Sequence, residues 1–143
     1  MGQPKIHFFS EEISFSPKQK TALRSWIQLT IEAELQRLKE LNFIFCNDAY
    51  LLKINQQFLN HDTYTDIITF DNSEESGLVV GDIFISVERV QENAEKLGLA
   101  ENEELHRVMI HGVLHLLGYT DKGKDKKAQM TEKENQYLGL RKF

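Results

Sequence analysis

The hydrophobic positions of this chain change their spacing along the sequence, and these changes predict which segments form strands and which form helices. Residues 4–9 are predicted to form a short opening strand. A helix is expected to begin at Ser16-Pro17, because serine is a common N-cap and proline is favoured at the first helical position. Its apolar face is predicted from residues at helical spacing: Leu23, Trp26, Ile27, Ile31, Leu35 and Leu38.

The middle of the chain predicts three strands and two helices. A strand is expected over residues 42–46, and Asn47 or Asp48 can cap a helix that reaches Phe58. Residues 66–71 and 78–86 are predicted to form a β-hairpin around the loop 72–77. Ser86 can then cap another helix, which Gly98 would end. The inward-facing residues of that helix are expected to be Val87, Val90, Ala94 and Leu97.

Two further helices complete the pattern. The first is expected to run from Asn102, its cap, to about Leu117, with Glu103 and Glu104 near the positive end of the helix dipole. The second is expected over residues 125–138. Four strands and about five helices in this order predict a single α+β domain over residues 1–143, with a mixed sheet and helices mostly on one face.

Composition and charge narrow the class of protein. The chain has 143 residues, of which 41% are hydrophobic and 27% charged, which is normal for a soluble globular domain. It contains no apolar run long enough for a membrane span and no signal-peptide pattern near its start. Cys46 is the only cysteine, which fits a reducing compartment, so a cytoplasmic location is expected.

A net charge of −5 argues against non-specific binding to duplex nucleic acid, since that affinity comes from neutralising many phosphates. A local exception is a run of lysines between residues 122 and 127, followed by basic residues near the C-terminus. This run fits either a solvated loop or a basic groove.

The segment 111–121 carries the candidate chemistry. His111 and His115 are four residues apart on a predicted helix, so both project from one face and can reach one metal ion. The flanking residues are almost all apolar, and two buried imidazoles need polar partners, which a shared ion supplies. Gly118 can end the helix, and Asp121 then offers a third ligand. Three protein ligands leave a position open for water, as in catalytic zinc sites, and a bound metal can lower the pKa of that water to about 7.

Other interpretations of these residues remain open. The two histidines could be core residues accompanied by a capping aspartate, and Asp125 is an alternative third ligand. His7, His61 and His106 have weaker claims, and His106 is expected at the surface. The helix also resembles that of zincin metalloproteases, which carry a glutamate after the first histidine as general base. Here that position is Gly112, which weakens the peptidase interpretation.

The run His-Gly-Val-Leu-His-Leu-Leu-Gly-Tyr at residues 111–119 closely resembles the signature of the YbeY family of bacterial metal-dependent endoribonucleases. Segments 54–58, 65–70 and 80–86 are similar to further motifs of that family. The resemblance implies an α+β fold with one zinc ion per chain and cleavage of single-stranded RNA. It also implies a role in maturing the 3′ end of small-subunit ribosomal RNA and in ribosome quality control, with the ribosome as partner.

Two positions depart from the family pattern. Asp121 stands where the family usually has a third histidine, although carboxylate oxygen also binds zinc. Leu59 stands where the family commonly has an arginine suited to binding a phosphate. His61, Lys122 and Lys124 are therefore considered as possible phosphate contacts.

The sequence leaves the catalytic residues unassigned. Metal-activated water is expected as the nucleophile, while attack by the 2′-hydroxyl of the RNA is the competing route. Asp66 and Asp82 are expected to be structural, and Thr65 and Asn55 to position the metal-bearing helix or to bind substrate. Two alternative functions remain, a zincin-like metallopeptidase and a non-catalytic ribosome assembly factor with a structural metal.

Overall fold

A four-stranded sheet organises the chain. Its strands are β1 (Ile6–Ser10), β2 (Arg37–Cys46), β3 (Ile67–Asp71) and β4 (Leu78–Ser86), in the order β1-β2-β4-β3. β2 is parallel to both β1 and β4, whereas β3 pairs with β4 in antiparallel fashion. The computed structural model describes residues 5–59 and 65–143. The predicted mixed sheet and the hairpin are therefore confirmed.

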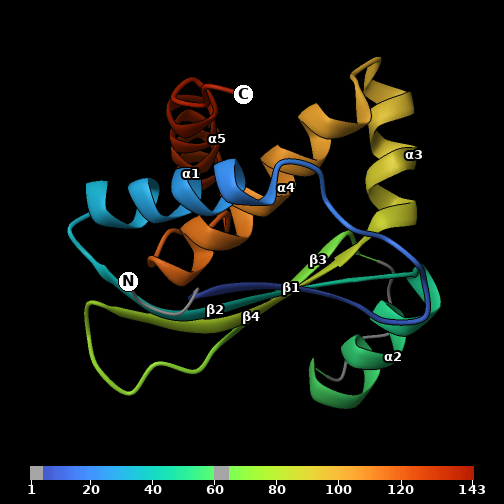
Figure 1. Ribbon diagram of the computed structural model, residues 1–143, viewed down its shortest axis with the longest axis horizontal. Helices are drawn as coiled ribbons and strands as arrows, with labels where there is room; N and C mark the ends of the chain where they lie inside the picture. Colours follow the sequence, from blue (N-terminus) through green and yellow to red (C-terminus); the bar gives the residue numbers. More distant parts are fainter. Residues whose placement is uncertain (1–4, 60–64) are drawn as a thin grey trace.

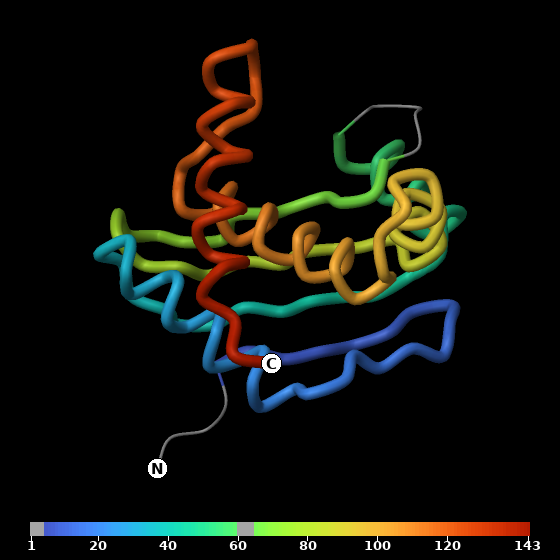
Figure 2. The backbone as a smooth tube through the Cα atoms, turned by 90° about the horizontal axis from the view of Figure 1, so that it is seen from above, coloured from blue at the N-terminus to red at the C-terminus, as the bar shows by residue number. Residues whose placement is uncertain are grey.

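Helices cover the two faces of the sheet unequally (Figure 1). One face carries α1 (Lys20–Ala33), α3 (Val87–Leu97), α4 (Glu101–Leu116) and α5 (Lys124–Leu138), and the other carries α2 (Asp48–Leu59). Figure 2 shows α4 running along the sheet, where it contacts β3 and β4. The α+β class, with helices mostly on one face, is confirmed. Within the described residues no helix is both long and apolar enough to cross a membrane.

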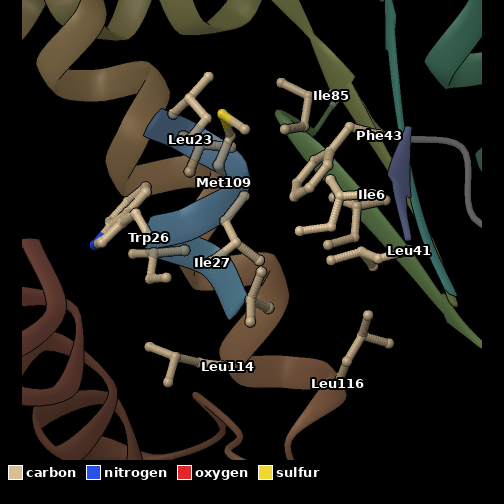
Figure 3. Packing of buried hydrophobic residues seen from close by; sticks show 14 of the residues in the cluster. Ile6, Leu23, Trp26, Ile27, Leu41, Phe43, Ile85, Met109, Leu114 and Leu116 are labelled. Carbon is tan, nitrogen blue, oxygen red and sulfur yellow. The ribbon is translucent and has the colours of Figure 1, made fainter. Parts of the chain in front are cut away.

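The main core lies between the sheet and the helices α1 and α4 (Figure 3). Ile27 from α1 and Met109 from α4 lie between their helices and Phe43 and Ile85 of the strands, whereas Trp26 lies on the other side of α1, where its Nε1 donates to Tyr137 O. A smaller apolar cluster under α2, on the opposite face, includes Cys46, Leu51 and Ile68. Both faces of the sheet are buried, which explains the long apolar runs in β2 and β4.

The start of α1 differs from the prediction. Gln19, immediately before the helix, has a left-handed backbone with φ of 58° and ψ of 48°, so the helix begins at Lys20 and not at Ser16-Pro17. The preceding segment is held out of the helix by packing, because Phe15 contacts Phe45 at 5.0 Å between ring centroids and Pro17 is buried. Tertiary packing thus outweighs the local capping signal.

The end of α1 was also predicted too late. Leu35 has φ of 61° and is 93% exposed, and Leu38 belongs to β2 and is buried. β2 therefore begins at Arg37, where the backbone N–H donates to Gly77 O at 2.9 Å. Leu35 and Leu38 continue the helical spacing of α1, so the sequence pattern assigned the start of β2 to the helix.

The predicted ends of α3 are confirmed, whereas the predicted burial of Leu97 and the predicted cap of α4 are wrong. Ser86 caps α3 as predicted, since its Oγ accepts a hydrogen bond from the Arg89 N–H at 3.2 Å, and Gly98 ends the helix with φ of 67°. Leu97, the last residue of α3, is 63% exposed, contrary to expectation. Helix α4 begins at Glu101, one residue before the predicted cap Asn102, and its N-cap is Ala100.

His106 is buried, so its predicted surface position was wrong. The C-terminal residues fold back over it: Phe143 contacts its ring at 5.3 Å between centroids, and the Arg141 guanidinium lies 2.8 Å from Nδ1. Trp26 packs against the ring at 5.8 Å. Burial, together with the charge of Arg141, lowers the pKa of His106 to about 4.

Helix α4 approaches the sheet most closely at Gly112. A Cβ atom at this position would lie 2.8 Å from Ile67 Cδ1 and 3.0 Å from Ile83 Cγ2, closer than ordinary van der Waals contact. Only a residue without a side chain lets the helix rest on β3 and β4 at this separation.

Replacing Gly112 with alanine is expected to lower the free energy of unfolding by about 1–3 kcal/mol, because the helix must move away from Ile67 and Ile83. Urea denaturation followed by circular dichroism measures this change. Gly139→Ala is the matched control, since Gly139 has φ of −67° and an added Cβ would meet atoms at 3.4 Å. Equal stability of the two variants would contradict the tight contact.

The low pKa of His106 predicts a loss of stability in acid. Its pKa is about 6.5 in the unfolded chain and lower in the folded one, so the unfolded state binds the proton first as pH falls. Stability is then complete above about pH 6.5 and declines toward pH 4. Denaturant melts of the metal-free protein should show a shallower decline for His106→Asn than for wild type. Parallel pH profiles would show that His106 does not titrate on unfolding.

Candidate metal centre

Three side chains converge at the C-terminal end of α4. His111 Nε2 and His115 Nε2 are 3.0 Å apart, and Asp121 Oδ2 lies 3.6 Å from the first and 3.9 Å from the second. The histidines lie one turn apart on α4, and Asp121 comes from the turn that follows. The structure thus brings together the three residues that the sequence singled out.

The turn that carries Asp121 is fixed by its backbone and by the end of α1. The N–H groups of Gly118 and Tyr119 donate to His115 O and Leu114 O, which is the Schellman pattern, and Gly118 has φ of 109°. The Tyr119 hydroxyl donates to Glu34 Oε1 at 2.6 Å. The Asp121 backbone therefore follows directly from an anchored helix end.

The donor set fits a transition metal such as zinc. Tetrahedral coordination with bonds of about 2.0–2.2 Å places ligand atoms roughly 3.3–3.6 Å apart, close to the three separations found here. Two imidazoles and one carboxylate are typical ligands of catalytic zinc. The Asp121 side chain is 42% exposed, so the group opens to solvent on that side. Asp125, the alternative ligand, is exposed in the first turn of α5 and lies outside this group.

A second layer of contacts lies behind His111. Glu134 Oε2 is 2.6 Å from His111 Nδ1, and Glu134 Oε1 accepts a hydrogen bond from Arg107 Nη1 at 2.8 Å. Neither Glu134 nor Arg107 was predicted from the sequence. A signal for Glu134 was present, because it lies one helical turn from Met130 and from Leu138, on the buried face of α5.

A cavity of about 440 Å³ is lined by two of the three candidate ligands, His111 and Asp121. Glu134, Lys127 and Asp66 also line it. Asp66 was expected to be structural, yet it shares this cavity with the candidate ligands. Glu104 belongs to the same wall, and its buried Oε1 has no hydrogen-bond partner among the described residues.

The two histidines differ electrostatically. Burial alone would lower the pKa of His111, but the hydrogen bond and charge of Glu134, with Asp121 and Asp66, raise it above its usual value. Burial and the neighbouring His111 lower the pKa of His115. Burial raises the pKa of Asp66, although the charge of His111 opposes this shift. Nearby carboxylates thus set the direction of the pKa shift of His111, whereas burial sets that of His115 and Asp66.

The expected phosphate contacts are only partly visible. His61 lies outside the described residues. Lys122 and Lys124 are exposed on and just after the turn, whereas Lys127, from the same lysine run, lines the cavity. Leu59 is the last residue of α2 and is 41% exposed.

The other polar candidates have local partners. Thr65 Oγ1 hydrogen-bonds to the backbone of Ile67 at the start of β3, and Asn55 is buried on α2. Asp82 on β4 accepts hydrogen bonds from Asn42 on β2 and from Asn72, just after β3, consistent with its expected structural role.

Known proteins match nearly the whole chain. The family model described as Endoribonuclease YbeY matches residues 5–141. A protein of Cytophaga hutchinsonii named Endoribonuclease YbeY is 48% identical over all of both chains. A protein of the same name from Karelsulcia muelleri is 51% identical over 95% of this chain and 89% of its own. The solution structure of TM1509 from Thermotoga maritima matches with a TM-score of 0.65 and 31% identity, over 93% of this chain and 86% of that one.

The geometry predicts that the purified protein, loaded with Zn²⁺ and passed over a desalting column, retains about one ion per chain. His111→Ala and Asp121→Ala should each lose it, whereas Asp125→Ala should keep it. Mass spectrometry of metal content measures the result. Zinc retained by Asp121→Ala but lost from Asp125→Ala would move the third ligand to Asp125. A wild-type protein that binds no zinc would refute the metal site.

Proposed function

The chain belongs to the YbeY family of endoribonucleases, and on this premise we propose that it is a zinc-dependent endoribonuclease that cleaves single-stranded RNA. The observation that carries the proposal is the group His111, His115 and Asp121, whose ligand atoms face one another beside an open cavity. The proposed centre holds one zinc ion per chain. The proposed role, which follows from family membership, is maturation of the 3′ end of small-subunit ribosomal RNA and ribosome quality control in the cytoplasm.

A zinc ion in this position supplies Lewis-acid polarisation of a phosphate oxygen and activation of water. The residues around it have to bind and orient the RNA. Lys127 lines the cavity and can pair with a phosphate as a point charge. Lys122 and Lys124 lie exposed beside Asp121 and extend this positive edge. Together they could take the part that an arginine at position 59 would otherwise play.

Asp66 is suited to exchanging a proton with the substrate. It faces the same cavity as His111, and burial raises its pKa, which favours the protonated carboxyl. Such a group can donate a proton to the oxygen that leaves the phosphate. We therefore assign Asp66, which immediately precedes β3, the role of proton donor in the reaction.

The peptidase alternative is disfavoured by the packing of α4. Zincin peptidases need a glutamate directly after the first histidine. Here a side chain at Gly112 would point into Ile67 and Ile83 of the sheet and not toward the candidate ligands. The helix therefore offers no room for that general base.

The assembly-factor alternative requires a closed, structural metal shell. The exposed side of Asp121 and the adjoining cavity favour an open coordination position. A binding role on the ribosome remains compatible with catalysis, so the two are separated by experiment.

The proposal predicts cleavage of an end-labelled single-stranded RNA and no cleavage of casein. His115→Ala should reduce the rate at least about 100-fold, since loss of a ligand costs more than loss of its supporting residues. His7→Ala, on β1 at the far edge of the sheet, is the control and should keep full activity.

The products of this assay also separate the two chemical routes. Hydrolysis by water can leave a 3′-hydroxyl, whereas attack by the 2′-hydroxyl passes through a cyclic phosphate. RNA left intact by zinc-loaded wild type, together with binding of His115→Ala to small ribosomal subunits, would favour the assembly factor. Cleavage of casein would favour the peptidase.

A further inference from the structure

Glu134 is a buried carboxylate held between a candidate ligand and a cation. Its Oε2 lies 2.6 Å from His111 Nδ1, and its Oε1 accepts from Arg107 Nη1 at 2.8 Å. Arg107 is itself oriented by Asn135 Oδ1, at 2.8 Å from Nη2. The Glu134 side chain is only 9% exposed, so both oxygens are committed to protein partners.

We propose that Glu134 is a positioning residue that keeps the His111 proton on Nδ1 and thereby presents the lone pair of Nε2 to the metal ion. This inference rests on the metal site proposed above. It assigns to α5 a direct part in preparing that site.

The role of Glu134 follows from hydrogen-bonding chemistry. An ionised carboxylate only accepts hydrogen bonds, so the short contact to Glu134 requires a proton on Nδ1. In neutral imidazole the other nitrogen then carries a lone pair. That nitrogen, Nε2, faces His115 Nε2 at 3.0 Å and Asp121 Oδ2 at 3.6 Å. The tautomer that suits Glu134 is therefore the one that can bind metal.

Arg107 explains why Glu134 stays in this orientation. The ion pair with Arg107 occupies the second carboxylate oxygen, so the first oxygen stays directed at His111. Glu134 also contacts the imidazole at Nδ1, on the side of the ring away from the group of ligand atoms, and it does not belong to that group. The two carboxylates thus differ in role, with Asp121 as ligand and Glu134 as orienting partner.

The first test reads the tautomer directly in metal-free wild type. Nitrogen-15 NMR of labelled imidazole, recorded at a pH above the titration of His111, should show the proton on Nδ1. A proton on Nε2 would overturn the proposal. This measurement needs no variant of Glu134, so it stands even if a substitution impairs folding.

The second test measures affinity for Zn²⁺ alone by competition with a chromophoric chelator. Glu134→Ala should bind zinc about 10–100-fold more weakly than wild type, as is typical for loss of a partner behind a metal ligand. Glu132→Gln, exposed on the same helix, should bind as wild type does. A folded Glu134→Ala that matches wild type would overturn the proposal.

The third test uses the single acceptor oxygen of an amide. In Glu134→Gln the one acceptor oxygen of the amide is attracted to the Arg107 guanidinium, so the amide N–H faces His111 Nδ1 as a donor. This favours the tautomer with the proton on Nε2, which cannot bind metal. Adding Arg107→Gln gives this N–H another acceptor and frees the oxygen for His111. The double variant should therefore bind zinc several-fold more tightly than Glu134→Gln. Equal or weaker binding by the double variant would count against the positioning role.

These readouts separate the present inference from the proposed function. Failure of wild type to bind zinc would remove the metal site itself. Normal zinc binding and RNA cleavage by wild type, with an unchanged Glu134→Ala, would leave the proposed function intact and remove only the role of Glu134.

Discussion

The contact between α4 and the sheet at Gly112 is the constraint on which the site depends. With no side chain at this position, the helix rests directly on Ile67 and Ile83. The residues on either side of that contact then point in fixed directions, and His111 is its immediate neighbour. The same contact brings the start of β3, with Asp66, to the cavity that His111 and Asp121 line. A helix held farther from the sheet would separate these groups.

Features set by a few neighbouring residues were predictable from the sequence. The histidine pair, the helix end at Gly118 and the Ser86 cap depend on local backbone geometry, and the structure contains each of them. The bounds of α1 were not predictable in this way, because Phe15 and Leu38 take their places by packing against distant strands. His106 is buried by C-terminal residues that lie far along the chain. Glu134 was missed for a related reason, since its partner His111 is on another helix.

Charge is distributed unevenly between the site and the rest of the protein. The carboxyl groups of Asp66, Asp121 and Glu134 line a single cavity, and any of them that is ionised repels a phosphate unless a cation balances it. Lys127 and the lysines near the turn supply part of that balance, and a divalent ion would supply more. With a net charge of −5, the protein has little long-range attraction for nucleic acid. Binding of RNA would then depend on whether a metal ion and the nearby lysines balance the negative charge of the site.

The proximity of the three candidate ligands along the chain has a consequence for folding. His111, His115 and Asp121 all lie within residues 111–121, so only a short loop has to close to bring them together, and the entropy cost of closure is small. The same segment can therefore chelate an ion, although less well, before the rest of the chain has folded. Because binding to the unfolded state offsets binding to the native state, the ion should raise the stability of the fold by less than its affinity for the native protein implies. Residues from outside this segment, above all Glu134 on α5, reach the site only in the native state. They therefore make the ion bind the native state more tightly than the unfolded state.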